Sequence, residues 1–445
     1  MASGRYPRLL LSLAAAATVV EGLRLTRGLP AAGHPATLTC RATATESCTL
    51  SGLATGKSNL LYPDPTTSQT RCLFSSSPEF AFQVVPRNPD RFLLHFQGGG
   101  ACWSEFTTLT MRACEFDRVV PYDIRSIFNG SSPDNPFKDY TVVVVPACSG
   151  DLHVGNVTRS YKDLNGVPVE QRGYYNTRAV LDWVKANTAG RRLSSFLITG
   201  ESAGGIGVQV WAPTLLSELS YEKAAVVIDS YVGVFPSGFE GSIVSEFGVC
   251  ETGLFKRQHL QDSCYTNRTT VADALDAAIE AFPRVVFAMI NSKYDETQQM
   301  FYNVAAMTSG RRKTDDIAYN RDMLAILRRH NRFPNFVSYL VTSRQHVFTT
   351  SLPFRRISNE SSLSLVLQTT LEVTQQDKQM KAENLISVCN GLLDWLAQLP
   401  LSEGGSIQSH CDLLDEEHQR AANRLPEKDF CDRSLVDKTF TNELA

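Results

Sequence analysis

The sequence has no excess of basic residues. Its 445 residues include 43 Lys and Arg against 46 Asp and Glu, and the formal net charge is −3. Proteins that hold nucleic acid or anionic membranes by charge need clusters of basic side chains, so neither partner is expected. The eleven cysteines contain no Cys-x-x-Cys pair, the usual ligand spacing of a zinc cluster, and we therefore expect no metal site of that kind.

Long apolar stretches are also scarce. Residues 9–20 are apolar but fall short of the about 20 residues that cross a bilayer. No later stretch is long and apolar enough, so no stable membrane insertion is expected. Arg5 and Arg8 give the chain a basic start and Gly22 follows the apolar segment, which is typical of a secretory signal peptide. We expect a signal peptide at residues 1–22; an uncleaved anchor is the alternative.

Two features agree with a secreted protein. Eleven cysteines are many for a reducing compartment. Sequons for N-linked glycan occur at Asn129, Asn156, Asn267 and Asn359. Three cysteine pairs are near enough in sequence to close small loops: Cys40/Cys48, Cys102/Cys114 and Cys250/Cys264. Cys389, Cys411 and Cys431 could tie down the C-terminal region, and the odd total leaves at least one thiol free or paired outside the chain.

The middle of the chain alternates between short apolar runs and helical patterns. The runs predict buried strands at residues 91–97, 141–145, 195–199, 224–228, 285–290 and 336–342. Helical spacing or capping predicts helices at 174–185, 271–282 and 314–327. Strands that alternate with helices predict an α/β fold, with a mostly parallel central sheet flanked by helices on both faces. We assign residues 61–400 to one catalytic domain, between a loosely structured lead-in at 23–60 and a polar, peripheral C-terminal extension at 401–445.

The strongest chemical signal is the motif Gly-Glu-Ser-Ala-Gly-Gly at residues 200–205, directly after a predicted strand. A serine nucleophile needs a sharp strand-to-helix turn that exposes its hydroxyl, and small neighbours let the backbone crowd there. The helix that follows directs its N-terminus at the serine and favours developing negative charge. Ser202 is the predicted nucleophile. A glycine-rich turn with an incidental serine is the alternative.

A second motif, Gln-Gly-Gly-Gly-Ala-Cys-Trp at residues 97–103, follows the first predicted buried strand. Acyl transfer requires backbone N–H groups aimed at the oxyanion, and such donors come from the residue after the nucleophile and from an earlier glycine-rich loop. The predicted donors are Gly99, Gly100, Ala101 and Ala203. The loop lacks the Gly-Lys-Ser/Thr ending and the GxGxxG spacing of phosphate-binding loops, while a plain tight turn remains open.

The base and the acid follow from chain order, which in this kind of fold is Ser, then Asp or Glu, then His. His346 lies in a short loop after the last predicted strand and is the predicted base. The other histidines precede the serine (His95, His153), lie in a disulfide loop or the tail (His259, His410, His418), or end a helix among arginines, where His330 is expected to be solvated. Asp295, after the strand at 285–290, is the predicted acid that orients the imidazole, and Asp229 is its competitor.

Taken together, these motifs resemble the pectin acetylesterase and Notum family of secreted serine hydrolases, over about residues 85 to 350. The matching segments are 98–102, 146–151, 200–205, 229–231 and 294–298. Three positions depart from the family pattern. Ala101 stands where tryptophan is usual, with Trp103 two positions later; Ser230-Tyr231 replaces Ser-Gly; and Gln345-His346-Val347 matches loosely around the base.

The resemblance implies an α/β-hydrolase fold and hydrolysis of carboxylic esters through an acyl-enzyme on Ser202, without cofactor or metal. It implies an acylated polysaccharide such as pectin as the substrate, deacetylated by the enzyme, or alternatively a lipid or protein ester. Trp103 is the predicted substrate-binding residue. A secreted binding protein that has lost activity is the alternative of a different class; a missing triad member would mark it, and none is missing here.

We expect the mature protein to start near Leu23 and, when made in a eukaryotic secretory pathway, to carry N-linked glycan, because the signal peptide and the sequons are both in place. Intact-mass measurement of the secreted protein, before and after glycan removal, reports both features. A mass that includes Met1, together with eleven free thiols, would contradict export and the disulfide interpretation.

Overall fold

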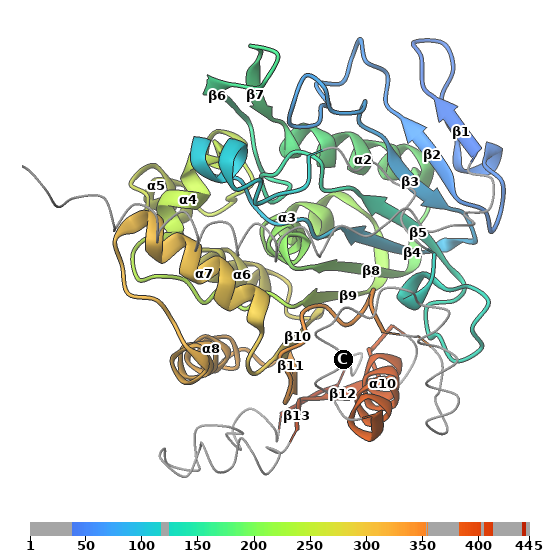
Figure 1. Ribbon diagram of the computed structural model, residues 1–445. Coiled ribbons are helices and arrows are strands. Elements are labelled where there is room, and N and C mark those ends of the chain that lie inside the picture. The colour runs from blue at the N-terminus through green and yellow to red at the C-terminus, as the bar shows by residue number, and fades with distance from the viewer. Residues whose placement is uncertain are drawn as a thin grey trace, which may run out of the picture.

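The predicted strands form the middle of a ten-stranded sheet in the computed structural model, which describes residues 38–116, 124–352, 354, 382–401, 405–412 and 438–441. The strand order is β1-β2-β3-β5-β4-β8-β9-β10-β11-β13, and Figure 1 shows it running from β1 at one edge to β13 at the other. The six predicted strands are confirmed as β4 (Asn88–Phe96), β5 (Tyr140–Val145), β8 (Leu193–Glu201), β9 (Tyr221–Asp229), β10 (Val286–Ser292) and β11 (Phe336–Val341). All six are parallel to their neighbours within this group.

The strand order reverses at β4. The chain passes from β4 to β5 on one side and returns to place β8 on the other side of β4. The carboxyl ends of β4 and β8 therefore lie side by side while their following segments depart in different directions, the arrangement that creates a binding crevice in α/β sheets. The glycine-rich loop follows β4 and Ser202 follows β8, so this crevice receives both predicted motifs.

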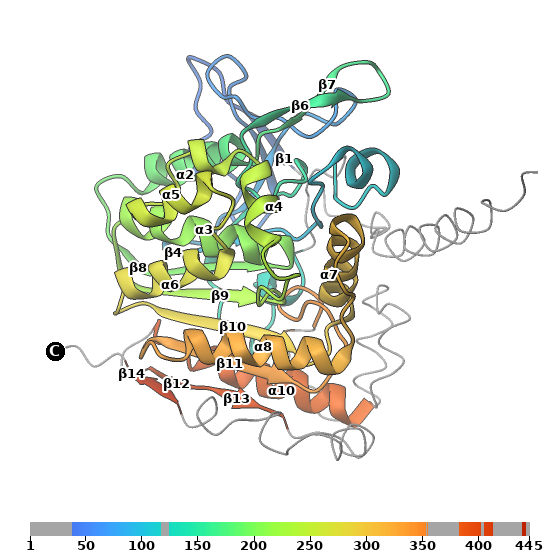
Figure 2. The ribbon, with the colours of Figure 1, turned by 90° about the vertical axis from the view of Figure 1, so that its left-hand side faces the viewer.

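Both faces of the sheet are covered, as the continuous apolar runs predicted. One core cluster joins Phe92, Phe196 and Phe287 to side chains of α2 (Gly173–Thr188), α3 (Ala203–Glu218), α6 (Val271–Ala281) and α8 (Asp316–His330). The other joins Leu93 and Leu197 to α10 (Ala382–Ala397), which Figure 2 shows beside β11 and β13. The described residues also form the α-helices α4 (Glu240–Glu246), α5 (Gln258–Tyr265) and α7 (Glu296–Ser309). Helix α8 begins at Asp316, two residues after the predicted start at 314, and is capped by Asp315.

The expectation of a loose lead-in is wrong for residues 38–60. β1 (Leu38–Arg41) and β2 (Asn59–Tyr62) belong to the sheet, where β2 pairs with the antiparallel β3 (Phe82–Val85). Leu60 and Leu61 are buried on opposite faces, and a disulfide between Cys40 and Cys48 closes the intervening turn. Four-residue strands carry too short a pattern to be seen against the polar residues around them. Residues 157–171 form a separate hairpin of β6 (Val157–Lys162) and β7 (Pro168–Gln171).

The described parts of the C-terminal extension are integrated into the fold, contrary to the peripheral position expected. β13 (His410–Cys411) extends the sheet beside β11. β12 (Ser406–Gln408) and β14 (Thr439–Thr441) pair with each other and bury Ile407 and Phe440 in the second core cluster. One apolar residue in each short strand is enough to anchor it, a signal that is invisible in a polar tail.

The three short-range disulfides predicted from sequence are present, Cys40–Cys48, Cys102–Cys114 and Cys250–Cys264. A fourth, Cys72–Cys148, joins residues 76 apart and was not foreseen, since such a separation gives no local signal. Cys411 is also disulfide-bonded, whereas Cys389 is a buried free thiol and does not tie down the C-terminal region. Asn267 is exposed, Asn129 and Asn156 are half-buried, and Asn359, Cys431 and the signal peptide lie outside the described residues.

Candidate active site

Ser202 occupies a strained turn between β8 and α3. Its backbone has φ 52° and ψ −123°, a conformation that residues other than glycine rarely adopt. Its amide donates to the carbonyl oxygen of Asp229 at 2.8 Å, which ties the turn to the neighbouring strand. A side chain at Gly204 would collide with the backbone carbonyl of Phe96, so the glycine two residues after the serine is a steric requirement. The sharp turn predicted for Ser202 is therefore present.

The backbone of the glycine-rich loop after β4 shows which of the predicted oxyanion donors are available to a ligand. Gly100 has φ 67°, and a side chain there would collide with the carbonyl of Ala113. The amide of Ala101 donates to that same carbonyl at 3.0 Å, so it cannot face an oxyanion, and this corrects the expectation for Ala101. Within the described residues no acceptor is in place for the amides of Gly100 and Ala203. Both residues line the pocket that contains Ser202, whereas Gly99 does not.

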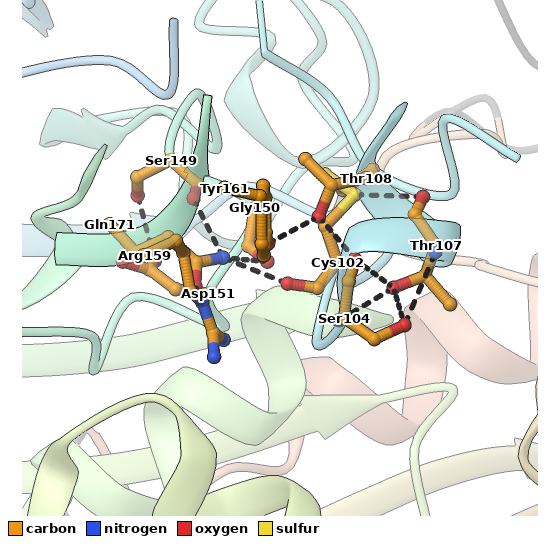
Figure 3. The surroundings of a disulfide bond; sticks show 11 residues. Cys102, Ser104, Thr107, Thr108, Ser149, Gly150, Asp151, Arg159, Tyr161 and Gln171 are labelled. Atoms are coloured by element: carbon orange, nitrogen blue, oxygen red, sulfur yellow. Dashed lines mark hydrogen bonds between the residues drawn. A yellow bond between two sulfur atoms is a disulfide. The ribbon is translucent and has the colours of Figure 1, made fainter. Parts of the chain in front are cut away.

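The loop is held from behind by a disulfide and a buried side chain (Figure 3). Cys102 is bonded to Cys114 and donates its amide to the carbonyl of Gly150 at 2.9 Å. The buried Gln171 amide donates to the carbonyl of Cys102 at 2.9 Å, and its own oxygen accepts from Arg159 at 2.6 Å. These bonds leave the loop little freedom to move relative to the body of the protein, which is the preorganisation that an oxyanion site needs.

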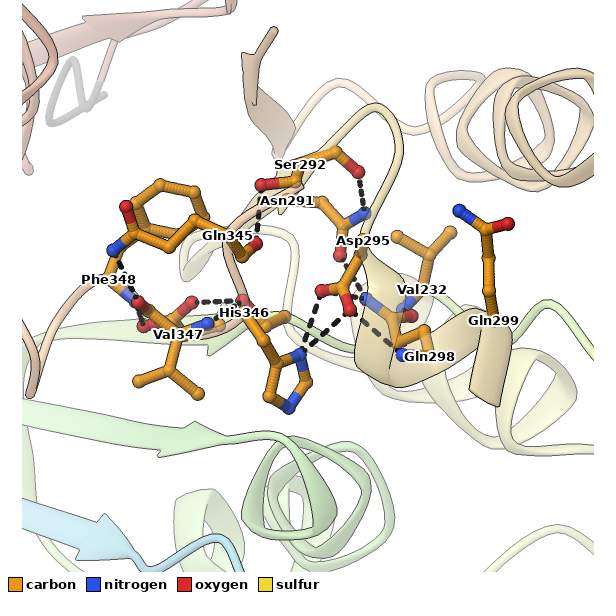
Figure 4. Close-up of polar contacts among 12 residues, drawn as sticks. Val232, Asn291, Ser292, Asp295, Gln298, Gln299, Gln345, His346, Val347 and Phe348 are labelled. Atoms are coloured by element: carbon orange, nitrogen blue, oxygen red, sulfur yellow. Dashed lines mark hydrogen bonds and ion pairs between the residues drawn. The ribbon is translucent and has the colours of Figure 1, made fainter. Parts of the chain in front are cut away.

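Asp295 and His346 are brought together as predicted. The Nδ1 atom of His346 lies 2.8 Å from Oδ2 and 3.0 Å from Oδ1 of Asp295, as Figure 4 shows. Asp295 is fully buried, caps the N-terminus of α7 and accepts hydrogen bonds from the backbone and side-chain amides of Gln298 at 2.8 and 2.9 Å. Its carboxylate is therefore fixed in orientation, with both oxygens directed at donors.

The environment of His346 favours its charged form. Burial alone would lower its pKa, but the charge and hydrogen bond of Asp295 outweigh burial, and the pKa of His346 is raised above its ordinary value. Its Nε2 atom has no hydrogen-bond partner among the described residues, and the ring lines the same pocket as Ser202. One ring nitrogen is thus occupied by a carboxylate and the other is available to a reacting group.

Asp229 does not contact the imidazole. Its Oδ2 atom accepts from the amides of Phe348 and Thr349 at 2.9 and 2.6 Å and from the Thr349 hydroxyl at 2.7 Å. Its Oδ1 atom accepts from the hydroxyl of Ser230 at 2.8 Å, which in turn accepts from the amide of Val347. Asp229 therefore holds the backbone that follows His346, while Asp295 holds its ring.

Two further polar groups were not foreseen or were misjudged, Glu201 beside the nucleophile and His330 at the end of α8. Glu201, within the nucleophile motif itself, is buried and contacts the glycine-rich loop and the segment after His346. Its place beside the serine was the available signal, but its partners are set by tertiary packing. His330, expected to be solvated, is completely buried with its Nδ1 atom 2.7 Å from Asp276, because the end of α8 folds against α6.

A pocket opens from Ser202 between α3, α4, α6 and α7. Trp103, the predicted substrate-binding residue, is part of its wall. Most of the other lining side chains are apolar: Leu152, Ile206, Phe235, Ile243, Val244, Val271 and Phe301. Ser230, Tyr231, Glu240, Thr297 and Gln298 are polar exceptions. The site is thus shaped for a group that is itself largely apolar.

The described residues contain neither a cluster of three or more side chains suited to a metal ion nor a helix long and apolar enough to cross a membrane.

Three comparisons with known proteins each found similar sequences or structures. A sequence model of the family described as Pectinacetylesterase matches residues 57–359. The palmitoleoyl-protein carboxylesterase NOTUM of Schmidtea mediterranea is 28% identical over 162 residues, which are 32% of this chain and 28% of that protein, so the match spans under a third of the relative. The solved structure of the Wnt deacylase Notum from Drosophila aligns with TM-score 0.45 and 16% identity, over 63% of this chain and 83% of that one. The family model matches more than half of the 445 residues of this chain, so the chain belongs to the pectinacetylesterase family.

Proposed function

We propose that the protein is a secreted serine hydrolase of carboxylic esters, with Ser202 as nucleophile, His346 as base and Asp295 as the residue that orients the base. The observation that carries this proposal is the contact of His346 with Asp295 beside a serine on a strained turn, in one shared pocket. Family membership supports esterase or deacylase activity. The disulfides and an exposed sequon at Asn267 support a secreted protein.

In the proposed reaction, Nε2 of His346 takes the hydroxyl proton of Ser202 as the serine oxygen attacks the ester carbonyl. The N–H groups of Gly100 and Ala203 stabilise the oxyanion of the tetrahedral intermediate. The imidazolium then protonates the leaving alcohol, and an acyl-enzyme remains on Ser202. A water molecule, deprotonated by His346, attacks the acyl-enzyme and releases the carboxylic acid, which restores the hydroxyl of Ser202.

Two substrate classes fit this chemistry. The family description points to acetyl groups on pectin, and the planarian relative is named for a palmitoleoyl protein. The apolar wall favours the second class, since each buried square ångström of apolar surface contributes about 25 cal/mol and an acetyl methyl would cover little of the wall. We therefore favour an acyl chain longer than acetyl, with polysaccharide deacetylation as the second candidate. Initial rates on p-nitrophenyl esters from acetate to palmitate separate the two.

Replacing Ser202 by Ala should reduce kcat/KM by several orders of magnitude with the fold intact, because the residual rate would come only from substrate binding and the oxyanion donors. Esterase rates, labelling by a fluorophosphonate probe and thermal melting measure the effect. Ser217→Ala, at the exposed far end of the same helix, is the matched control and should label like the unmodified protein. An unmodified protein that neither labels nor hydrolyses any ester would favour the inactive binding protein instead.

Asp295→Asn and Asp229→Asn should have different consequences. Asp295→Asn should lower kcat by about three to four orders of magnitude with a small change in Tm, because the amide disturbs the tautomer of His346. Asp229→Asn should lower the free energy of unfolding by about 1–3 kcal/mol and reduce kcat less, because an NH2 group cannot accept the hydrogen bonds that hold residues 348 and 349. Measuring kcat and Tm for both variants tests the assignment; a stable and inactive Asp229→Asn variant would reverse the two roles.

Glu240 should make the binding of long acyl chains depend on pH. Burial raises its pKa to about 7, and the nearby charge of Asp273 acts in the same direction, against hydrogen bonds from Val271 and Tyr231 and the charge of Arg329. A bound alkyl chain excludes water from the pocket and so favours the neutral carboxyl. Below pH 7 the carboxyl of Glu240 is already mostly neutral. Above pH 7, the ratio of kcat/KM for long-chain esters to kcat/KM for acetate esters should fall by up to about tenfold per pH unit.

The measured quantity is the ratio of kcat/KM for a long-chain ester to that for the acetate ester, because effects on His346 cancel in this ratio. Glu240→Gln should make the ratio independent of pH between 6 and 8. A ratio that rises with pH in the unmodified protein, or that changes equally in the variant, would show that Glu240 does not face the bound chain.

A further inference from the structure

Glu201 connects the nucleophile to the segments on either side of it. It is the last residue of β8, immediately before Ser202, and only 4% of its surface is exposed. Its Oε1 atom accepts from the amide of Gly98 at 3.3 Å, and its Oε2 atom accepts from the hydroxyl of Thr350 at 2.8 Å. The same Oε2 atom lies 3.1 Å from Nε2 of His95 on β4. A single carboxylate therefore touches three residues from two segments, the end of β4 with its following loop and the segment after His346.

Two of these partners belong to the proposed reaction machinery. Gly98 begins the loop that carries the oxyanion donor Gly100, and Thr350 lies four residues after His346. The loop packs closely on the turn: a side chain at Gly98 would meet the backbone and Cγ of Glu201 and the Cβ of Ser202 at 3.0 to 3.1 Å. The carboxylate of Glu201 thus lies where the oxyanion loop, the nucleophile and the histidine loop meet.

The sheet register explains why Glu201 shares this task with Asp229. Glu201 pairs with Asp229 across β8 and β9, so the two carboxylates end neighbouring strands. Asp229 holds residues 348 and 349, and Glu201 holds residue 350. Three consecutive residues after the proposed base are therefore fixed by two adjacent strand ends, and only Glu201 extends the connection to the glycine-rich loop.

We infer that Glu201 is a positioning residue that sets the oxyanion loop and the histidine loop at a fixed distance on either side of Ser202. The inference rests on the proposed function. Its physical reason is that the rate of acyl transfer depends steeply on geometry: a displacement of about 1 Å can cost about 100-fold in rate. The bonds from Gly98 and Thr350 to one carboxylate link the two loops directly across the serine turn.

A role in stability alone would give different measurements from a positioning role. The charge of Glu201 is also among the influences that raise the pKa of His346, after those of Asp295 and Asp229. The charged and titratable groups around it are His95 on β4, His153, Asp229 on β9 and His346. Removing the charge should therefore move the acid limb of the kcat/KM profile to lower pH, since His346 would lose its proton more readily.

The test compares three substitutions with p-nitrophenyl esters as substrate. Glu201→Gln removes the charge and should lower kcat by about tenfold or more, leave KM within about twofold and shift the acid limb to lower pH. Thr350→Val removes one hydrogen bond and keeps the charge, so it should lower kcat with the acid limb unmoved. Thr350→Ser keeps the hydroxyl and should recover most of that loss. Glu222→Gln, at the exposed opposite end of β9, is the control for a lost surface charge.

The outcomes separate this inference from the proposed function. If Glu201→Gln and Thr350→Val keep the kcat and acid limb of the unmodified protein, the positioning role is rejected, whatever happens to Tm. If Glu201→Gln fails to fold, the Thr350→Val and Thr350→Ser pair decides: equal kcat in the two variants overturns the inference, and recovery in the serine variant supports it. Activity that survives Ser202→Ala would instead reject the hydrolase site itself.

Discussion

The parallel pairing of β4 with β8 is the constraint on which the site depends. It brings the glycine-rich loop and the serine turn together at the carboxyl ends of the two strands. It also leaves no room for a side chain at Gly204 beside the carbonyl of Phe96. The strained backbone of Ser202 persists because the neighbouring strand accepts its amide and α3 begins at once behind it. Packing on both sides thus offsets the cost of a conformation that an isolated chain would avoid.

Three buried carboxylates at or just beyond the ends of three adjacent strands organise the other half of the site. Glu201 ends β8, Asp229 ends β9, and Asp295 follows β10 by three residues. A buried carboxylate is costly unless donors surround it, and each of the three is hydrogen-bonded. His346 and the residues that follow it donate to all three, together with Gly98, Ser230 and Gln298. Satisfying the carboxylates therefore fixes the loop that carries the proposed base.

The pocket adds the remaining property of the site. Much of its wall comes from helices that lie after the serine in the chain, and Trp103 and Leu152 come from earlier segments. In the proposed function, the strand ends hold the groups that react with the ester, and the apolar wall contacts the acyl group. This separation is why motif resemblance indicated ester hydrolysis and left the acyl group open.

The sequence by itself determined what depends on local pattern. Continuous apolar runs located the six parallel strands, GESAGG located the serine turn, and short spacing paired Cys40, Cys102 and Cys250 with their neighbours. It could not detect strands of four residues such as β2, because their pattern is too short. It could not detect the Cys72–Cys148 disulfide, because the two cysteines are distant in the chain.

Tertiary structure alone decided which partner each polar group meets. The folded structure shows that Asp295, and not Asp229, contacts His346. It also shows that the amide of Ala101 donates to the carbonyl of Ala113 and that Glu201 joins two loops. The physical reason is range. An apolar run or a tight turn is a property of consecutive residues, whereas a hydrogen bond between buried groups depends on which strand ends lie side by side.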